Sequence, residues 1–106
     1  MSERDIAKTS GSMPVRSRLI TFVEFVDMTG VHPSRLGELI ELGWIEPQRT
    51  GQEAYLFRIR DVYRLRKLMR LMDDLELGLA GGTIVVDLLE RIEFLENKVA
   101  ELERLL

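Results

Sequence analysis

The feature that most constrains this chain is a regular repeat of apolar residues near its end. From residue 83 to residue 106 the apolar side chains recur at spacings of three and four, with no Gly or Pro in between. This spacing is a heptad repeat, the pattern by which one helix packs against another along a narrow seam. The sequence therefore predicts a long helix that pairs with a second copy of the chain through Val85, Leu88, Ile92, Leu95, Val99 and Leu102, with Leu106 continuing the repeat.

The charged residues beside the seam favour parallel, in-register pairing. Arg91 and Lys98 occupy one flank of the heptads, and Glu96 and Glu103 occupy the other. In a parallel pair each basic residue would meet a glutamate of the partner helix, whereas in an antiparallel pair Arg91 and Lys98 would meet each other. The alternative to both arrangements is a helix that folds back onto its own domain.

The composition argues against most catalytic chemistry. The chain has 106 residues, enough for one small domain and the long helix. It contains no cysteine and a single histidine, so we expect no disulfide, no thiol catalysis, no metal site and no cofactor. The net charge of −3 argues against binding nucleic acid through overall charge alone. We expect a non-enzymatic protein.

The sequence lacks the hydrophobic segments that would direct it to a membrane. No run approaches the ~20 apolar residues of a membrane span, and residues 1–14 contain no apolar stretch of signal-peptide length. We therefore expect a cytoplasmic protein.

Three segments follow from the pattern of apolar and flexible residues. Residues 1–17 mix Ser, Gly, Pro and charged residues and are predicted to be a flexible leader. Residues 18–76 would form a folded head, and residues 77–106 would form the dimerisation helix. Residues 76–82 are rich in glycine and would form the hinge or helix start between them.

The head begins with two predicted short helices. Residues 18–20 could form a strand, and Thr21 with Glu24 makes a capping box that predicts a helix over residues 22–28, ended by Gly30. Pro33 predicts the start of a second helix, because a proline at the first turn lacks only an N–H that would be unpaired there anyway. The buried side of this second helix would carry Leu36 and Ile40.

A hairpin and a third helix complete the predicted head. Two β-prone runs, residues 44–47 and 54–57, flank a polar loop with a glycine and predict a small β-hairpin. Residues 59–75 predict a third helix, with an apolar face made of Val62, Leu65, Leu68, Met69, Met72 and Leu75. The sequence therefore predicts a mainly α protein: a winged helix-turn-helix head followed by a long coiled-coil helix.

Several short motifs resemble those of known proteins in the same order. The layout of helix pair, hairpin and third helix before a coiled coil resembles the MerR-type winged-helix proteins. Within that superfamily the closer resemblance is to the CbpM chaperone modulator family. The motifs that carry it are Thr21-Phe22-Val23-Glu24-Phe25, Thr29-Gly30-Val31, Leu42-Gly43-Trp44-Ile45-Glu46-Pro47, and Leu77 with Gly82 ahead of Leu88-Leu89 and Ile92.

This resemblance implies a regulator that binds another protein. CbpM binds the J-domain of CbpA, a DnaJ-like co-chaperone, and such binding would block the J-domain's action on its chaperone ATPase. A J-domain presents a basic second helix, so a competitor should offer carboxylates to it. We therefore expect the J-domain contacts to include Glu24, Asp27, Glu38 and Glu41, although a solvated acidic surface is the simpler interpretation of these residues.

The alternative that the resemblance leaves open is a MerR-like DNA-binding transcription regulator. The second helix of the DNA-binding members carries an Arg-Tyr-Tyr run, but here the matching stretch reads Gly37-Glu38-Leu39, and the Gly-Tyr-Arg of the wing becomes Ala54-Tyr55-Leu56. An acidic residue at this place would repel phosphate. Nucleic-acid binding is thus possible but disfavoured, and its candidate contacts are Arg35, Arg49, Arg60 and Arg64. Ordinary MerR dimers pair their long helices antiparallel, so the resemblance and the flanking charges favour opposite strand directions.

Overall fold

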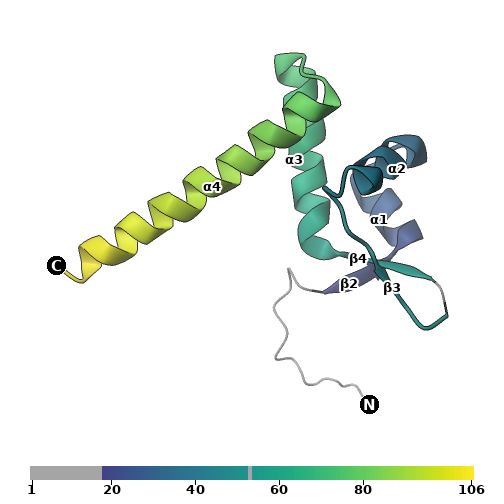
Figure 1. Cartoon of the computed structure of the whole chain (residues 1–106), viewed down its shortest axis with the longest axis horizontal. Helices are drawn as coiled ribbons and strands as arrows, with labels where there is room; N and C mark the ends of the chain where they lie inside the picture. The colour runs from purple at the N-terminus through teal and green to yellow at the C-terminus, as the bar shows by residue number, and fades with distance from the viewer. Residues whose placement is uncertain (1–17, 53) are drawn as a thin grey trace. The chain divides into compact units, whose positions relative to one another are not determined.

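The computed structural model describes residues 18–52 and 54–106, so the predicted leader, residues 1–17, lies outside the described residues (Figure 1). The chain separates into two compact units, Met1–Leu65 and Arg66–Leu106, and each is described by itself. Among the described residues there are four helices and a three-stranded sheet. This confirms the predicted fold class, a mainly α winged helix-turn-helix head with a long C-terminal helix.

The sheet of the first unit is small and antiparallel. Its strands are β2 (Leu19–Thr21), β3 (Gln48–Arg49) and β4 (Tyr55–Arg58), in the order β2-β4-β3. Ile20 pairs with Phe57 in the β2-β4 register, and both side chains are buried. This central pair ties the start of the described chain to the strand that leads into the third helix.

The first helix, α1 (Phe22–Thr29), begins and ends as its sequence predicts. The backbone N–H of Thr21 donates to Glu24 Oε1 at 2.9 Å, and the backbone N–H of Glu24 donates to Thr21 Oγ1 at 3.2 Å. This is a complete capping box, which satisfies two N–H groups that the helix itself cannot pair. Gly30 ends the helix with a φ of 72°, a left-handed conformation that glycine adopts without a steric penalty.

The second helix, α2 (Pro33–Glu41), starts at Pro33 as predicted, with His32 as its N-cap. His32 Nδ1 accepts the backbone N–H of Ser34 at 3.1 Å. The helix buries Leu36 and Leu39, which are 1% and 0% exposed, whereas Ile40 is 36% exposed. The expectation that Ile40 lies on the buried side was therefore wrong. Leu39 occupies that place, and Ile40 lies at the edge of the contact.

The hairpin differs from its prediction in its first strand. Residues 44–47 are not a strand, and β3 instead lies at residues that the sequence had placed in the loop. The reason is that the backbone N–H groups of Trp44 and Ile45 both donate to the Leu39 carbonyl, at 3.0 and 3.2 Å. These donors finish the end of α2, so they are not available to a β-ladder. Ile45 then inserts into the core, where it is 1% exposed.

The core of the first unit gathers one or two side chains from almost every element. Phe25 of α1 stacks on Phe57 of β4 with ring centroids 4.6 Å apart, and both rings are buried. Aromatic pairs at this separation add to the stabilisation that burial alone gives. Around them lie the other fully buried side chains of the unit, Leu36, Leu39, Ile45, Val62 and Leu65.

The third helix, α3 (Ile59–Leu75), has the predicted bounds and continues from the first unit into the second. In the second unit Leu68 is fully buried, whereas Leu75, also expected on the apolar face, is 57% exposed at the last position of the helix. Glu76 follows with a φ of 53° and turns the chain. The predicted head boundary at residue 76 coincides with this turn and stays a prediction.

The long helix, α4 (Leu79–Arg104), begins at a close contact with α3 inside the second unit. A Cβ on Gly82 would lie 2.7 Å from Leu68 Cδ1 and 2.9 Å from Met72 Cγ, so only glycine fits without a shift. Gly82 and Thr83 are buried, and Val86, one turn on, is 0% exposed. The start of α4 therefore packs against α3 at Gly82, while every residue from 91 onward is exposed.

Candidate functional site

The four carboxylates expected to meet a partner lie on α1 and α2, and all four residues are exposed. Glu24 and Asp27 belong to α1, and Glu38 and Glu41 belong to α2. Glu24 differs from the others because its carboxylate also serves the capping box. The backbone and side-chain hydrogen bonds from Thr21 lower the pKa of Glu24. Glu24 therefore has a structural task in addition to any role in binding.

The outer face of α2 is acidic and small. Helical geometry places Ser34, Glu38 and Glu41 on the side opposite the buried Leu36 and Leu39. Arg35 lies three residues before Glu38, at the border of this face, and the exposed Gly37 beside it contributes no side chain. In a helix-turn-helix protein this is the helix that enters the major groove and faces phosphates. Two carboxylates on this helix would repel the phosphates of DNA and attract a cationic partner.

Three of the four candidate phosphate-binding arginines are exposed on the first unit. Arg35 lies on α2, Arg49 on β3 and Arg60 at the start of α3. Arg49 places its guanidinium carbon 5.5 Å from the centroid of the Tyr55 ring. The Nε of Arg60 lies 3.9 Å from the Asp61 carboxylate, and its side chain is 53% exposed. These residues remain accessible to a partner, but no two of them lie on the same element.

The fourth arginine, Arg64, has a structural role that the sequence did not reveal. Its Nη1 donates to Asp61 Oδ1 at 3.1 Å and to the Trp44 carbonyl at 3.3 Å, and its guanidinium carbon lies 4.1 Å from the centroid of the Trp44 ring. Its side chain is only 16% exposed, and that of Asp61 is 4% exposed. Arg64 thus fixes the segment after α2 to the start of α3, which leaves little of its guanidinium to meet phosphate. The spacing of Asp61 and Arg64 was the one available signal for this pair.

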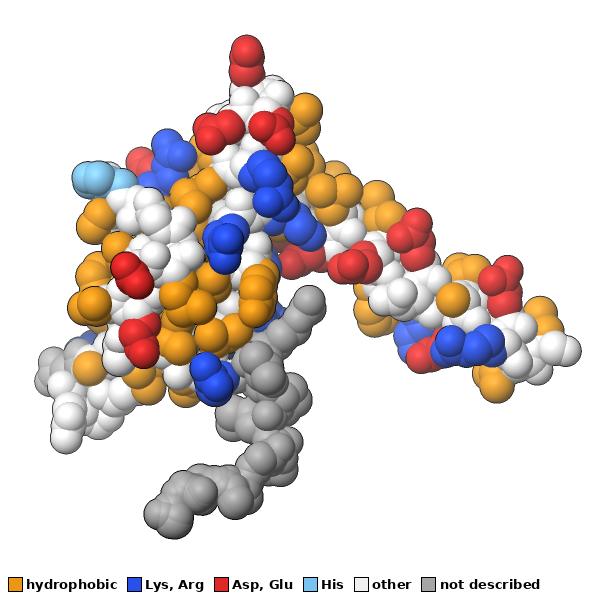
Figure 2. Space-filling model, turned by 180° about the vertical axis from the view of Figure 1, so that it is seen from behind, with side chains coloured by type: hydrophobic (Ala, Val, Ile, Leu, Met, Phe, Trp, Pro, Cys, Tyr) orange, Lys and Arg blue, Asp and Glu red, His pale blue; other side chains and the backbone are white. Residues whose placement is uncertain are grey.

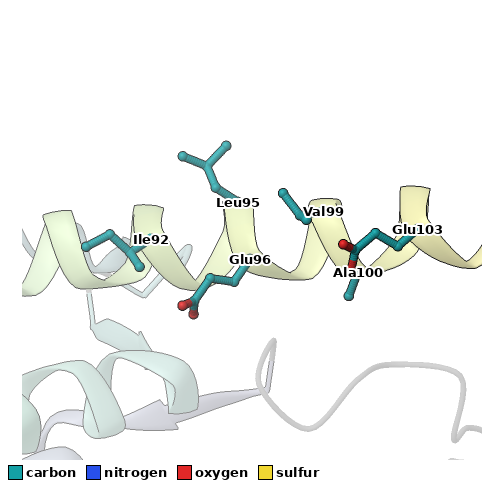
Figure 3. A pocket seen from close by; sticks show the side chains of 6 residues that line it. All are labelled: Ile92, Leu95, Glu96, Val99, Ala100 and Glu103. Atoms are coloured by element: carbon teal, nitrogen blue, oxygen red, sulfur yellow. The ribbon is translucent and has the colours of Figure 1, made fainter.

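The heptad side chains of α4 form an apolar face along the exposed part of the helix. Figure 3 shows Ile92, Leu95 and Val99 on successive turns, with the carboxylates of Glu96 and Glu103 beside them. The seam residues from Leu88 to Leu102 are between 45% and 61% exposed, and the space-filling view shows apolar side chains distributed along this helix (Figure 2). Val85 is partly buried, because it lies next to the part of α4 that packs on α3.

The basic residues beside this face, Arg91 and Lys98, contact other side chains of α4. The guanidinium of Arg91 and the ammonium of Lys98 lie 5.2 and 5.8 Å from the centroid of the Phe94 ring. Lys98 Nζ also lies 3.8 Å from Glu101 Oε1. Exposed contacts of this kind are weak, so both side chains can turn to a partner helix at little cost.

Two further features of residues 18–52 and 54–106 bear on the kind of site. In these residues there is no group of three or more His, Cys, Asp or Glu side chains that could hold a metal ion. No helix among them is long and apolar enough to cross a membrane. Besides the exposed arginines, two surfaces are candidate partner sites: the acidic face of α2 and the apolar face of α4.

A short helix pair, a small three-stranded sheet and a long C-terminal helix define a winged helix-turn-helix fold. Residues 20–104 match the family described as MerR HTH family regulatory protein. The chain belongs to this family, and within it the chain is CbpM-like, as the following relatives indicate.

The relatives include two chaperone modulatory proteins named CbpM. The protein from Salmonella paratyphi B is 31% identical over 86 residues, 81% of each chain. The protein from Coxiella burnetii is 33% identical over 67 residues, 63% of each chain. A putative heat shock protein HspR from Streptomyces coelicolor is 36% identical over 76 residues, 72% of this chain and 46% of that protein. The match thus spans about half of HspR and under two thirds of the Coxiella protein.

Proposed function

We propose that this protein is a chaperone modulator that binds the J-domain of a CbpA-type co-chaperone and blocks its action on the chaperone ATPase. The observation that carries the proposal is the outer face of α2, where the exposed Glu38 and Glu41 lie opposite the buried side of the helix. Carboxylates held on a rigid helix attract the basic helix of a J-domain and steer its approach. The names of the relatives, chaperone modulatory and heat shock proteins, support the same conclusion.

The test is a calorimetric titration of the purified protein with the J-domain of its own genome's CbpA-type protein. We expect saturable binding at micromolar concentrations that weakens as salt is raised, because exposed charges are screened. The double variant Glu38→Gln, Glu41→Gln should bind at least about tenfold more weakly. The matched control is Glu93→Gln, which removes one carboxylate from the exposed part of α4. Absence of a saturable signal for the native protein would refute the proposal.

We also propose that the active form is a homodimer joined through the apolar face of α4. An isolated helix with this many half-exposed branched side chains is more stable when it buries them against a second helix. Leu95→Asp places a charge in the seam and should give a monomer in sedimentation velocity. Asn97→Asp adds the same charge at an exposed position outside the heptad seam and should leave the dimer intact. A dimer that survives Leu95→Asp would mean that another surface holds it.

DNA binding is the second candidate function, and the exposed Arg35, Arg49 and Arg60 of the head are the observation that favours it. The arginines could contact phosphates around a site that α2 itself cannot read. A gel-shift series over increasing salt tests this function. Sequence-selective binding that falls steeply with salt would support it, whereas no shift at low salt would eliminate it.

A further inference from the structure

The middle of α2 contains a glycine that the fold of the chain does not require. Gly37 is the fifth residue of the nine-residue helix α2, its φ is not left-handed, and it is exposed. A Cβ built on Gly37 would meet no atom within 4 Å. Gly82 is different, because a Cβ there would meet Leu68 at 2.7 Å. Neither the backbone conformation nor close packing within the chain explains a glycine at position 37.

A glycine in this place weakens the helix that carries it. Relative to alanine, a glycine in a helix interior shifts the folding equilibrium by about fivefold towards the unfolded state. The helix tolerates the loss because Leu36 and Leu39 hold its inner side in the core, where they are 1% and 0% exposed. The glycine therefore removes side-chain bulk from the outer side of α2 without loosening the inner side.

Gly37 lies next to the two carboxylates of α2, so the missing side chain leaves space for a partner beside them. Glu41 lies one turn after Gly37, and Glu38 is its neighbour in the chain. A partner backbone can approach most closely where no side chain stands, and close approach brings its cationic side chains within hydrogen-bonding distance of carboxylates on either side. Charge complementarity thus selects one kind of occupant, a basic helix.

We infer that Gly37 is the point of closest approach of the basic J-domain helix, which packs across α2 at this glycine while its cations reach Glu38 and Glu41. The inference rests on the proposed function, and it adds an uncharged residue, Gly37, to the proposed J-domain binding site. It makes the α2 surface a steric as well as an electrostatic recognition site. Any side chain at position 37 should hold the partner helix away from the carboxylates.

The experiment compares Gly37→Ala and Gly37→Gln with the matched control Gly81→Ala by calorimetric titration with the same J-domain. Gly81 is also an exposed helical glycine with no atom within 4 Å of a built Cβ, but it lies in α4. All three variants should unfold at higher temperature than the native protein, because each replaces a helical glycine with a better helix former. We expect Gly37→Ala to weaken J-domain binding about tenfold and Gly37→Gln to weaken it further, since small steric shifts separate charged hydrogen-bonding groups. Gly81→Ala should bind as the native protein does.

The outcomes separate this inference from the function on which it rests. If both position-37 variants bind like the native protein while the Glu38→Gln, Glu41→Gln double variant binds weakly, the steric inference is wrong and the proposed function stands. If the native protein does not bind the J-domain, both are wrong. A loss of binding in Gly81→Ala equal to that in Gly37→Ala would also overturn the inference, because helix stiffening alone would then explain it.

Discussion

The contact between α3 and α4 at Gly82 predicts a loss of stability when this glycine becomes alanine. The added Cβ would lie 2.7 Å from Leu68 Cδ1 and 2.9 Å from Met72 Cγ. Non-bonded carbon atoms are most stable at about 3.5–4.0 Å, so both neighbours must move by roughly 1 Å. Met72 is half-buried and flexible, but Leu68 is 0% exposed and has no free space to enter.

The size of the effect follows from two opposing terms. Overpacking a well-filled contact costs about 1–3 kcal/mol. Replacing glycine by alanine in a helix stabilises it by up to about 1 kcal/mol. Gly81→Ala isolates the second term, because a Cβ at Gly81 meets nothing within 4 Å. The free energy of unfolding of Gly82→Ala should therefore lie about 1–3 kcal/mol below that of Gly81→Ala.

Urea unfolding followed by circular dichroism measures this difference, with protein concentration fixed so that any association affects all variants equally. The double variant Leu68→Ala, Gly82→Ala supplies a second check, because removal of the Leu68 methyl groups makes space for the new Cβ. In a double-mutant cycle the two changes should be less destabilising together than their sum. Equal stability of Gly82→Ala and Gly81→Ala would refute the close approach of the two helices.

Three further perturbations test other parts of the head. Because hydrogen bonds from Thr21 lower the pKa of Glu24, its carboxylate stabilises the fold above the unfolded pKa near ~4.3 and loses this effect as pH falls through the folded pKa. Glu24→Ala should therefore be less stable than the native protein at neutral pH, and the difference should shrink as the pH falls through the folded pKa of Glu24; a pH-independent difference in urea unfolding would contradict this. The Nη1 of Arg64 lies 3.1 Å from the buried Asp61 carboxylate. Arg64→Met removes this cation and should lower the free energy of unfolding by about 3 kcal/mol. Adding Asp61→Asn should recover part of that loss, and a cost below about 1 kcal/mol would mean that solvent already screens the pair. Gly30→Ala forces a side chain into a φ of 72° and should cost about 1 kcal/mol, so a gain in thermal stability would refute the need for a left-handed residue there.

Local signals in the sequence predicted the helices well, because their causes are local. The capping box of Thr21 and Glu24, the left-handed Gly30 and the first-turn Pro33 each act within a few residues, and each is confirmed. The bounds of α3 follow from a long apolar periodicity and also agree with the prediction. The heptads predicted a long helix at the end of the chain, and α4 is that helix; its pairing with a second copy stays a prediction.

The candidate site was only partly readable, because side-chain identity does not reveal what a side chain already contacts. Glu38 and Glu41 were predicted from charge and lie on the outer face of α2. Glu24 carries the same charge, but its carboxylate also caps a helix. Arg64 looked like the other arginines, yet Trp44 and Asp61 hold it inside the head. The sequence also does not reveal that the space beside Gly37 is empty.

The sequence by itself determined the order and kind of the elements, since helix caps, turns and apolar periodicity act over one to four residues. The tertiary structure decided which side chains enter the core and which backbone groups are already hydrogen-bonded. Leu39 took the core place that Ile40 could have filled, and its carbonyl accepted the N–H groups that would have made residues 44–47 a strand. Contact with Leu68 and Met72 of α3 buries α4 at Gly82, off the heptad seam. Such choices depend on competition between residues distant in the chain for the same space and hydrogen-bonding partners, and only the folded arrangement resolves that competition.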